Sequence, residues 1–136
     1  MTPAAIRRAY LREAFVAVVL ARIAVRFVSP ARIFAWANRP PRRINRFATN
    51  EVAWVSWAVE QTGTKPWGNA LCLPRALATH AMLRRRGIAS RLCLGVARKD
   101  QALVAHAWVE IGEGGVTVDR EAGRFTPLAQ FGGARS

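Results

Sequence analysis

The sequence contains few residues of the kinds that build cross-links and metal sites, with two cysteines and two histidines among 136 residues. Two cysteines cannot form a disulfide framework. Without a signal-peptide pattern we expect a cytoplasmic protein in which Cys72 and Cys93 are free thiols. The four residues lack the spacing of a zinc site, and neither a phosphate-binding glycine motif nor an internal repeat is present. We therefore expect no metal and no cofactor.

Acidic residues are also scarce, with eight against 21 lysines and arginines, which gives a net charge of +13. The imbalance is concentrated in residues 1–50, where ten arginines and one acid, Glu13, give a net charge of +9. Such a segment is typical of proteins that bind nucleic acid, an anionic membrane or an acidic peptide. A solvated basic face has the same composition, so charge alone leaves these alternatives open.

No apolar run is long enough for a transmembrane segment. Residues 14–20 are apolar, but Arg12, Arg22 and Arg26 frame them too closely for the roughly 20 residues that a span needs. A weak association with a membrane surface through an amphipathic helix stays open. With 51% apolar residues, the chain is nevertheless long enough for one domain with its own core.

Hydrophobic periodicity predicts helices first and strands afterwards. We expect helices at 3–28, 31–38, 47–62 and 71–86, strands at 90–98, 103–110, 116–119 and 125–128, a turn at Lys99-Asp100, and a frayed tail from Gly132 to Ser136. This order predicts an α+β fold. We divide it into N-terminal basic helices, residues 1–46, that pack on a core formed by residues 47–136.

Cys72 lies at the predicted start of a helix. Because proline is tolerated only in the first helical turn, Pro74 places Cys72 at or beside the N-cap, and Gly87 predicts where the helix ends. Unpaired backbone N–H groups and the helix dipole stabilise negative charge there. Since the thiolate is the nucleophilic form of cysteine, Cys72 is a candidate nucleophile. Cys93, in mid-strand, is interpreted as a small buried side chain.

A cysteine nucleophile needs a base, and only His80 and His106 are available. His80 lies eight residues further along the same helix, about 12 Å from Cys72. It falls on the apolar stripe, so we interpret it as a packed histidine with a local partner. His106 lies in the predicted strand 103–110, on the face that also carries Trp108. The pattern alone leaves open whether His106 is a core or a catalytic residue.

Asp119 follows in the next predicted strand. A two-residue turn at Gly112-Glu113 would set His106 opposite Asp119, with Cβ atoms about 4.5–5.5 Å apart. A four-residue loop at 112–115 would instead set Asp119 opposite Trp108, diagonal to His106. In either register the carboxylate can orient the imidazole, as the third member of a triad does.

A tetrahedral intermediate also needs two hydrogen-bond donors for its oxyanion. The backbone N–H of Cys72 is the natural first donor, and Gln61 or Asn69 could supply the second. Trp67, in the loop before Cys72, and Trp108 are candidate walls of a substrate cleft, although a tryptophan in mere packing fits the same positions.

These motifs together resemble a known family. Cys-Leu-Pro-Arg-Ala-Leu at 72–77, the helix exit at 83–88, His-Ala-Trp-Val-Glu at 106–110 and the following Asp119 are similar to the transglutaminase-like cysteine peptidases of lasso-peptide biosynthesis. The resemblance covers about residues 50 to 130. It implies a papain/transglutaminase-like core in which the nucleophile helix packs on a small antiparallel sheet. The implied roles are Cys72 as nucleophile, His106 as general base and then acid, and Asp119 as the group that orients His106.

The resemblance further implies a peptidase that removes the leader from a ribosomally made precursor peptide. About 70 residues, predicted to be helical, precede Cys72, so the chain resembles the stand-alone peptidase half, which needs a separate leader-recognition protein. The released core peptide would pass to an asparagine-synthetase-like macrolactam cyclase, and no nucleic-acid partner is expected.

Two other functions fit the same sequence. Another transglutaminase-like acyl transferase or amidase would share the triad and differ in the acceptor. A non-enzymatic basic adaptor would bind a peptide or a membrane through the N-terminal helices and leave the triad idle.

Overall fold

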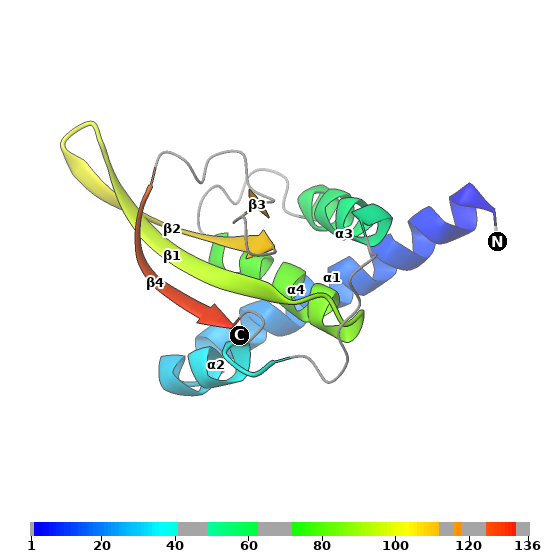
Figure 1. Ribbon diagram of the computed structural model, residues 1–136, viewed down its shortest axis with the longest axis horizontal. Coiled ribbons are helices and arrows are strands. Elements are labelled where there is room, and N and C mark those ends of the chain that lie inside the picture. The colour runs from blue at the N-terminus through cyan, green and yellow to red at the C-terminus, as the bar shows by residue number, and fades with distance from the viewer. Residues whose placement is uncertain (1, 41–48, 63–71, 112–115, 118–124, 133–136) are drawn as a thin grey trace.

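The computed structural model of the chain describes residues 2–40, 49–62, 72–111, 116–117 and 125–132. These residues form an α+β fold, as predicted (Figure 1). The helices are α1 (Pro3–Phe27), α2 (Pro30–Ala37), α3 (Thr49–Thr62) and α4 (Cys72–Arg85), and the strands are β1 (Ser90–Lys99), β2 (Ala102–Ile111), β3 (Val116–Thr117) and β4 (Thr126–Gly132). The boundary proposed at residue 46 lies outside the described residues.

Local capping residues set the helix ends. The side chain of Thr2 accepts a hydrogen bond from the Ala5 N–H at the start of α1, and Ser29 accepts one from Arg32 at the start of α2. Each of these caps is followed by a proline at the first helical position. At the end of α4, Gly87 has a φ of +75°, which a residue without a Cβ adopts at no steric cost.

Helix α4 is the centre of the fold. It contacts α1 and α3 as well as β1 and β2, so it lies between the helical layer and the sheet (Figure 1). Its buried side chains join those of the other helices and the inner sheet face in one core cluster. That cluster includes Val18, Ile33, Val55, Leu77, Met82, Leu83, Leu92, Ala107 and Val109. The predicted packing of the nucleophile helix on an antiparallel sheet is confirmed.

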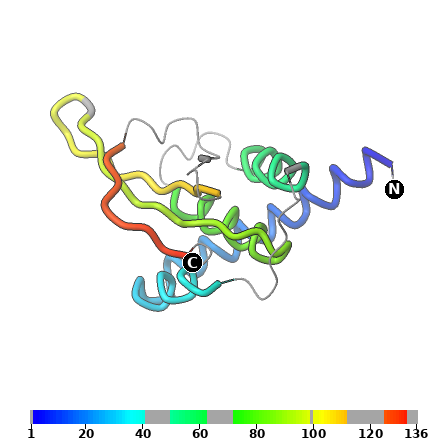
Figure 2. Tube along the Cα trace, in the orientation of Figure 1, coloured from blue at the N-terminus to red at the C-terminus, as the bar shows by residue number. Residues whose placement is uncertain are grey.

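The sheet has the strand order β3-β2-β1-β4, with antiparallel pairing throughout. Strands β1 and β2 form a hairpin that projects past the helices (Figure 2). Asp100 and Gln101 make its turn, both with positive φ, as a two-residue turn of type I′ requires. The predicted turn at Lys99-Asp100 is therefore wrong by one residue, because β1 pairs through Lys99 with Ala102.

The pairing of β2 with β3 decides between the two hairpin registers. Ile111 pairs with Val116, which leaves four residues between the strands. The two-residue turn at Gly112-Glu113 is therefore wrong, and the observed register is that of the four-residue loop.

The last strand is longer than the sequence indicates. Strand β4 runs to Gly132, which pairs with Arg91 and donates its N–H to the side-chain oxygen of Asn38, 2.9 Å away. Gly132 is thus part of the sheet rather than of a frayed tail. It has a φ of +95°, and a Cβ there would lie 2.7 Å from the carbonyl oxygen of Ala37, so the position needs glycine.

Candidate active site

Cys72 is the first residue of α4, as Pro74 predicts. Its thiol is free and half-buried, and it packs against the edge of the core cluster. The N-terminal end of a helix presents unpaired N–H groups, which suit a thiolate or an oxyanion. Cys72 therefore combines partial access with the local field that a nucleophile needs.

Arg75 lies one turn after Cys72 and is not among the site residues predicted from the sequence. Its Nε is buried without a hydrogen-bond partner in the described part of the structure. Residues three apart on a helix are neighbours on its surface, so Arg75 and Cys72 share one side of α4. The only sequence signal for it is its place in the Cys-Leu-Pro-Arg motif.

Cys93, unlike Cys72, is inaccessible. It is completely buried in β1 beside Trp108, in a small cluster on the outer sheet face. Burial, and to a lesser extent the charge of Glu110, raise the pKa of its thiol to about 11. Cys93 is therefore a packing residue, as expected from its place in mid-strand.

His80 is a packed histidine, as predicted, but its partners are not local. It is 3% exposed; its Nε2 donates to the carbonyl oxygen of Ala37, 2.8 Å away, and its Nδ1 accepts from the Ser90 hydroxyl, 2.7 Å away. A carbonyl oxygen can only accept, so these bonds fix the neutral tautomer that carries its proton on Nε2. Burial lowers the pKa of His80, and the nearby Arg84 cation acts in the same direction. His80 joins α2, α4 and β1.

His106 lies in the middle of β2 and is half-buried. Its ring stacks on Phe125, with centroids 4.6 Å apart, and on Trp108, with centroids 6.1 Å apart. It therefore lies on the outer sheet face, while Ala107 and its neighbours on the inner face belong to the core cluster with α4. The predicted alternation of the two faces of β2 is confirmed.

Trp108 is held from several sides. Its Nε1 donates to Glu110, 3.1 Å away, and Glu110 also pairs with Arg91, 3.5 Å away. A Cβ at Gly95 would lie 2.7 Å from the Trp108 ring, so the indole lies directly on this glycine. Because Gly95 pairs with His106 across the hairpin, the same glycine sets the surroundings of both rings. Trp108 is 2% exposed, so here it acts as a packing support for His106.

Of the remaining predicted site residues, the structure describes one and leaves three outside the described ranges. Gln61 is exposed near the end of α3. Trp67, Asn69 and Asp119 lie outside the described residues. Their roles, like that of Gln61 as an oxyanion donor, stay predictions.

The structure places Cys72 at the start of α4, which packs on the inner face of the sheet, and the His106 ring on the outer face of β2. A half-buried thiol at a helix N-terminus and a half-buried imidazole on the neighbouring strand are the groups that acyl transfer through a thioester requires. Their assembly with Asp119 into a triad stays a prediction. Among the described residues, no group of three His, Cys, Asp or Glu side chains lies close enough together to hold a metal ion, and no helix is long and apolar enough to cross a membrane.

A comparison with protein families finds a match over most of the chain. The model described as the transglutaminase-like superfamily matches residues 15–130, from the middle of α1 into β4. The match includes Cys72, His106 and Asp119. No curated protein and no solved structure matches the chain.

Proposed function

The chain belongs to the transglutaminase-like superfamily, which includes cysteine peptidases and acyl transferases, and on that premise we propose that it is the leader peptidase of a lasso-peptide pathway. Its two cysteines carry the proposal. Cys72 is partly accessible at the N-terminus of the central helix, whereas Cys93 is buried with a raised pKa. Only Cys72 meets the requirements of a nucleophile.

The reaction begins at Cys72. Its thiol transfers a proton to His106 and the sulfur attacks the carbonyl carbon of the scissile peptide bond. The resulting oxyanion is stabilised by the Cys72 backbone N–H and by a second donor, Gln61 or Asn69. The positive end of the α4 dipole and the Arg75 cation favour the same negative charge.

His106 then acts as acid and base in turn. It gives its proton to the leaving amine as the peptide bond breaks, and later removes a proton from the water that hydrolyses the thioester. Asp119 orients the imidazole, and the Trp108 ring with Glu110 restricts its position. The products are the leader with a new carboxylate and the core peptide with a new amine.

The substrate and partners follow from the same proposal. The substrate is a ribosomally made precursor peptide, which a separate leader-recognition protein presents in the cytoplasm. The freed amine of the core peptide is the group that an asparagine-synthetase-like macrolactam cyclase needs to close a ring. The chain thus acts between recognition and cyclisation.

The decisive experiment is cleavage of a lasso-peptide precursor by the chain in the presence of the leader-recognition protein that binds that precursor. Mass spectrometry should show two fragments whose masses sum to that of the precursor plus one water. Cys72→Ala should abolish both fragments with an unchanged circular dichroism spectrum, and Cys93→Ala is the matched control that still cleaves. Cleavage by Cys72→Ala, or a product that has gained an amine instead of water, would contradict the proposal.

A second measurement distinguishes an enzyme from a basic adaptor. If Cys72 is the nucleophile of an enzyme, iodoacetamide should alkylate it faster than it alkylates a free cysteine peptide. An idle thiol would react at the rate of the peptide. Cys93→Ala is used throughout, so that Cys72 is the only thiol observed.

A further inference from the structure

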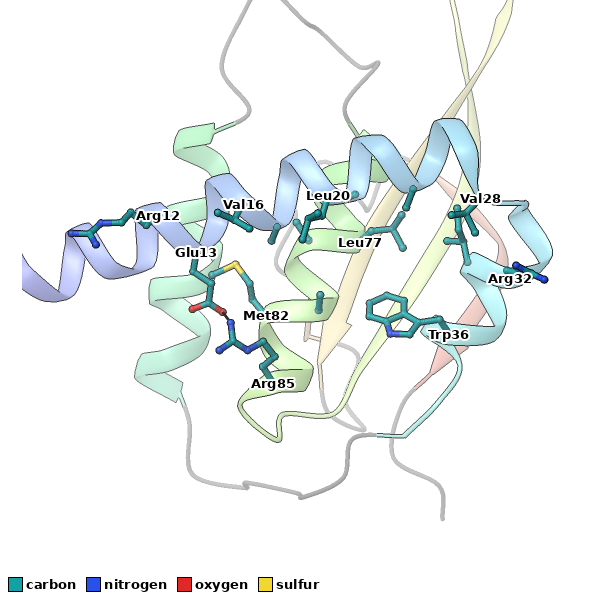
Figure 3. Close-up of a pocket in the computed structure, with 16 residues that line it drawn as sticks. Arg12, Glu13, Val16, Leu20, Val28, Arg32, Trp36, Leu77, Met82 and Arg85 are labelled. Atoms are coloured by element: carbon teal, nitrogen blue, oxygen red, sulfur yellow. Dashed lines mark hydrogen bonds and ion pairs between the residues drawn. The ribbon is translucent and has the colours of Figure 1, made fainter.

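An open groove runs between α1, α2 and α4 on the side of the helical layer away from the sheet. Its volume is about 790 Å³. Figure 3 shows the side chains that line it, which come from all three helices. We call the apolar part of the lining, which includes Val16, Leu20, Val28, Leu77 and Met82, the floor of the groove. We refer to this surface as the α1–α2–α4 groove.

The floor of the groove is apolar and its rim is basic. Arg12 and Arg85 lie toward one end of the groove and Arg32 lies at the other (Figure 3). The one acid in the lining, Glu13, is already engaged: its carboxylate binds Arg86 at 2.6 Å and Arg85 at 3.0 Å. Those cations hold the pKa of Glu13 below its usual range, so it stays charged and paired. The rim therefore carries a net positive charge.

The apolar floor continues onto the open face of α1. Leu20 is 59% exposed there, and Ile23 and Phe27 lie beside it at 50% and 75%. Large apolar side chains gathered in this way on a helix that also faces a groove mark a surface that another molecule covers. Exposed apolar side chains that are scattered singly over a surface would need no such explanation.

We propose that the α1–α2–α4 groove binds an amphipathic helix of a partner protein, about 16 residues long, with apolar side chains on one face and acidic residues flanking them. The length follows from the side of the groove that runs from Arg12 in α1 to Val28, the C-cap of α1, or about 24 Å at 1.5 Å per residue. The charge follows from the arginines of the rim, because acidic residues at both ends of the bound helix would meet them.

The groove favours a helix over an extended strand. All three of its walls are helices, whose backbone groups are already bonded, so an added strand would find no sheet edge to pair with. A chain buried against an apolar floor must satisfy its own backbone hydrogen bonds, which a helix does.

Two other occupants fit less well. A membrane surface is broad, so it would contact the rim and the outer side of α1 and leave the concave floor unfilled. A second copy of this chain would bring two basic surfaces together, since each copy carries a net charge of +13.

The proposal does not depend on catalysis, because it concerns binding alone. The groove is nevertheless near the proposed nucleophile: Leu77, which lines it, follows Cys72 by five residues, or about 8 Å along α4. A failure of precursor cleavage and a failure of binding are therefore separate results.

The test uses a fluorescent designed peptide of about 16 residues, with leucines at helical i, i+3 and i+4 spacing and glutamates elsewhere. Its counterpart has lysine in place of every glutamate. We expect fluorescence anisotropy to show saturable binding of the acidic peptide, at least about tenfold tighter than binding of the basic one. Added salt should weaken it, because the rim charges are exposed.

Two pairs of variants locate the binding. Leu20→Glu places a carboxylate on the floor and should weaken acidic-peptide binding at least about tenfold. Phe15→Glu is its control, since Phe15 is on the same helix at 63% exposure but does not line the groove. Arg32→Glu should weaken binding about threefold to fivefold, while Arg8→Glu makes the same change of charge on α1 outside the groove and should have little effect.

Several results would overturn the proposal. One is equal binding of the two peptides, or no binding of the acidic one; another is equal loss in Leu20→Glu and Phe15→Glu. Binding to vesicles of phosphatidylglycerol and phosphatidylcholine that Leu20→Glu abolishes would assign the groove to a membrane surface. A dimer in sedimentation experiments that dissociates in Leu20→Glu would assign it to a second copy.

Discussion

Each of the two histidines lies beside a tryptophan ring, but the two differ in burial and in hydrogen bonding. His80 meets the edge of Trp36, with ring centroids 5.6 Å apart, and His106 stacks on Trp108 at 6.1 Å. His80 is 3% exposed, with both ring nitrogens hydrogen-bonded, at a junction of three elements. His106 is half-buried on the outer face of a sheet.

The difference shows what makes a histidine structural. In His80 the ring proton on Nε2 and the lone pair on Nδ1 are both held in buried hydrogen bonds, so neither is available for proton transfer to a substrate. Removing this ring leaves a carbonyl and a hydroxyl unsatisfied. A partly accessible imidazole, such as that of His106 beside Trp108 and Phe125, can be reached by a reactant, so it suits proton transfer. We therefore expect substitutions around His80 to lower stability and substitutions around His106 to lower turnover.

The largest effect is expected from His106→Ala. Removal of a general acid–base lowers turnover by about 10²- to 10⁴-fold. The loss of stability should be small beside that, since a stacked ring pair contributes about 0.5–1.5 kcal/mol. Precursor cleavage per folded molecule is the measurement, and His80→Ala is the comparison. If His80→Ala lost as much turnover per folded molecule, the two regions would not be separable in this way.

The next largest effect is expected from His80→Ala on stability. It leaves the Ala37 carbonyl and the Ser90 hydroxyl without partners inside the core, which should lower the free energy of unfolding by about 2–4 kcal/mol. Urea denaturation measures it. His106→Ala should lose less than half as much, and a reversal of that order would contradict the assignment of His80 as the structural histidine.

A smaller effect is expected from Gly95→Ala, which tests the support of His106. The new Cβ would lie 2.7 Å from the Thr126 carbonyl oxygen and from the Trp108 ring, and such overpacking costs about 1–3 kcal/mol. Because the indole must move, turnover should fall as well as stability. Ala97→Ser, two residues further along the same face of β1, is the control and should change neither by a comparable amount.

The smallest effect is the pH dependence that His80 contributes. Its pKa is lowered in the folded state, so as the pH falls below its usual value of about 6.5 the unfolded chain takes up a proton that the folded one excludes. Stability due to His80 is therefore present above that pH and is lost below it. Urea midpoints at about pH 7.5 and 5.5 should differ more for the wild type than for His80→Gln, which cannot titrate. Equal differences would show that another group dominates this range.

Much of the local structure follows from neighbouring residues alone. Thr2-Pro3, Ser29-Pro30 and Gly87 set helix ends because their dihedral preferences and side-chain caps act within one turn. Alternation along β2 separated His106 from the apolar inner face for the same reason, and Pro74 located Cys72 at the helix start. The candidate nucleophile and base were therefore identified without tertiary information.

Other features depended on residues far apart in the sequence. The partners of His80 are Ala37 and Ser90, 43 and 10 residues away, where the sequence suggested a local one. The sequence predicts that Gly132 belongs to a frayed tail, because the residues that hold it in the sheet are far away in the chain. These are Asn38, which accepts its N–H, and Arg91 of β1, with which it pairs.

By itself the sequence determined the type and order of the elements, the α+β class and the separate natures of Cys72 and Cys93, since these follow from periodicity, caps and neighbours. Only the tertiary structure decided the β2–β3 register, the position of Gly132 between α2 and β1, and the groove between three helices. Each of these is a relation between surfaces that the chain brings together from a distance, and such relations leave no local pattern in the sequence.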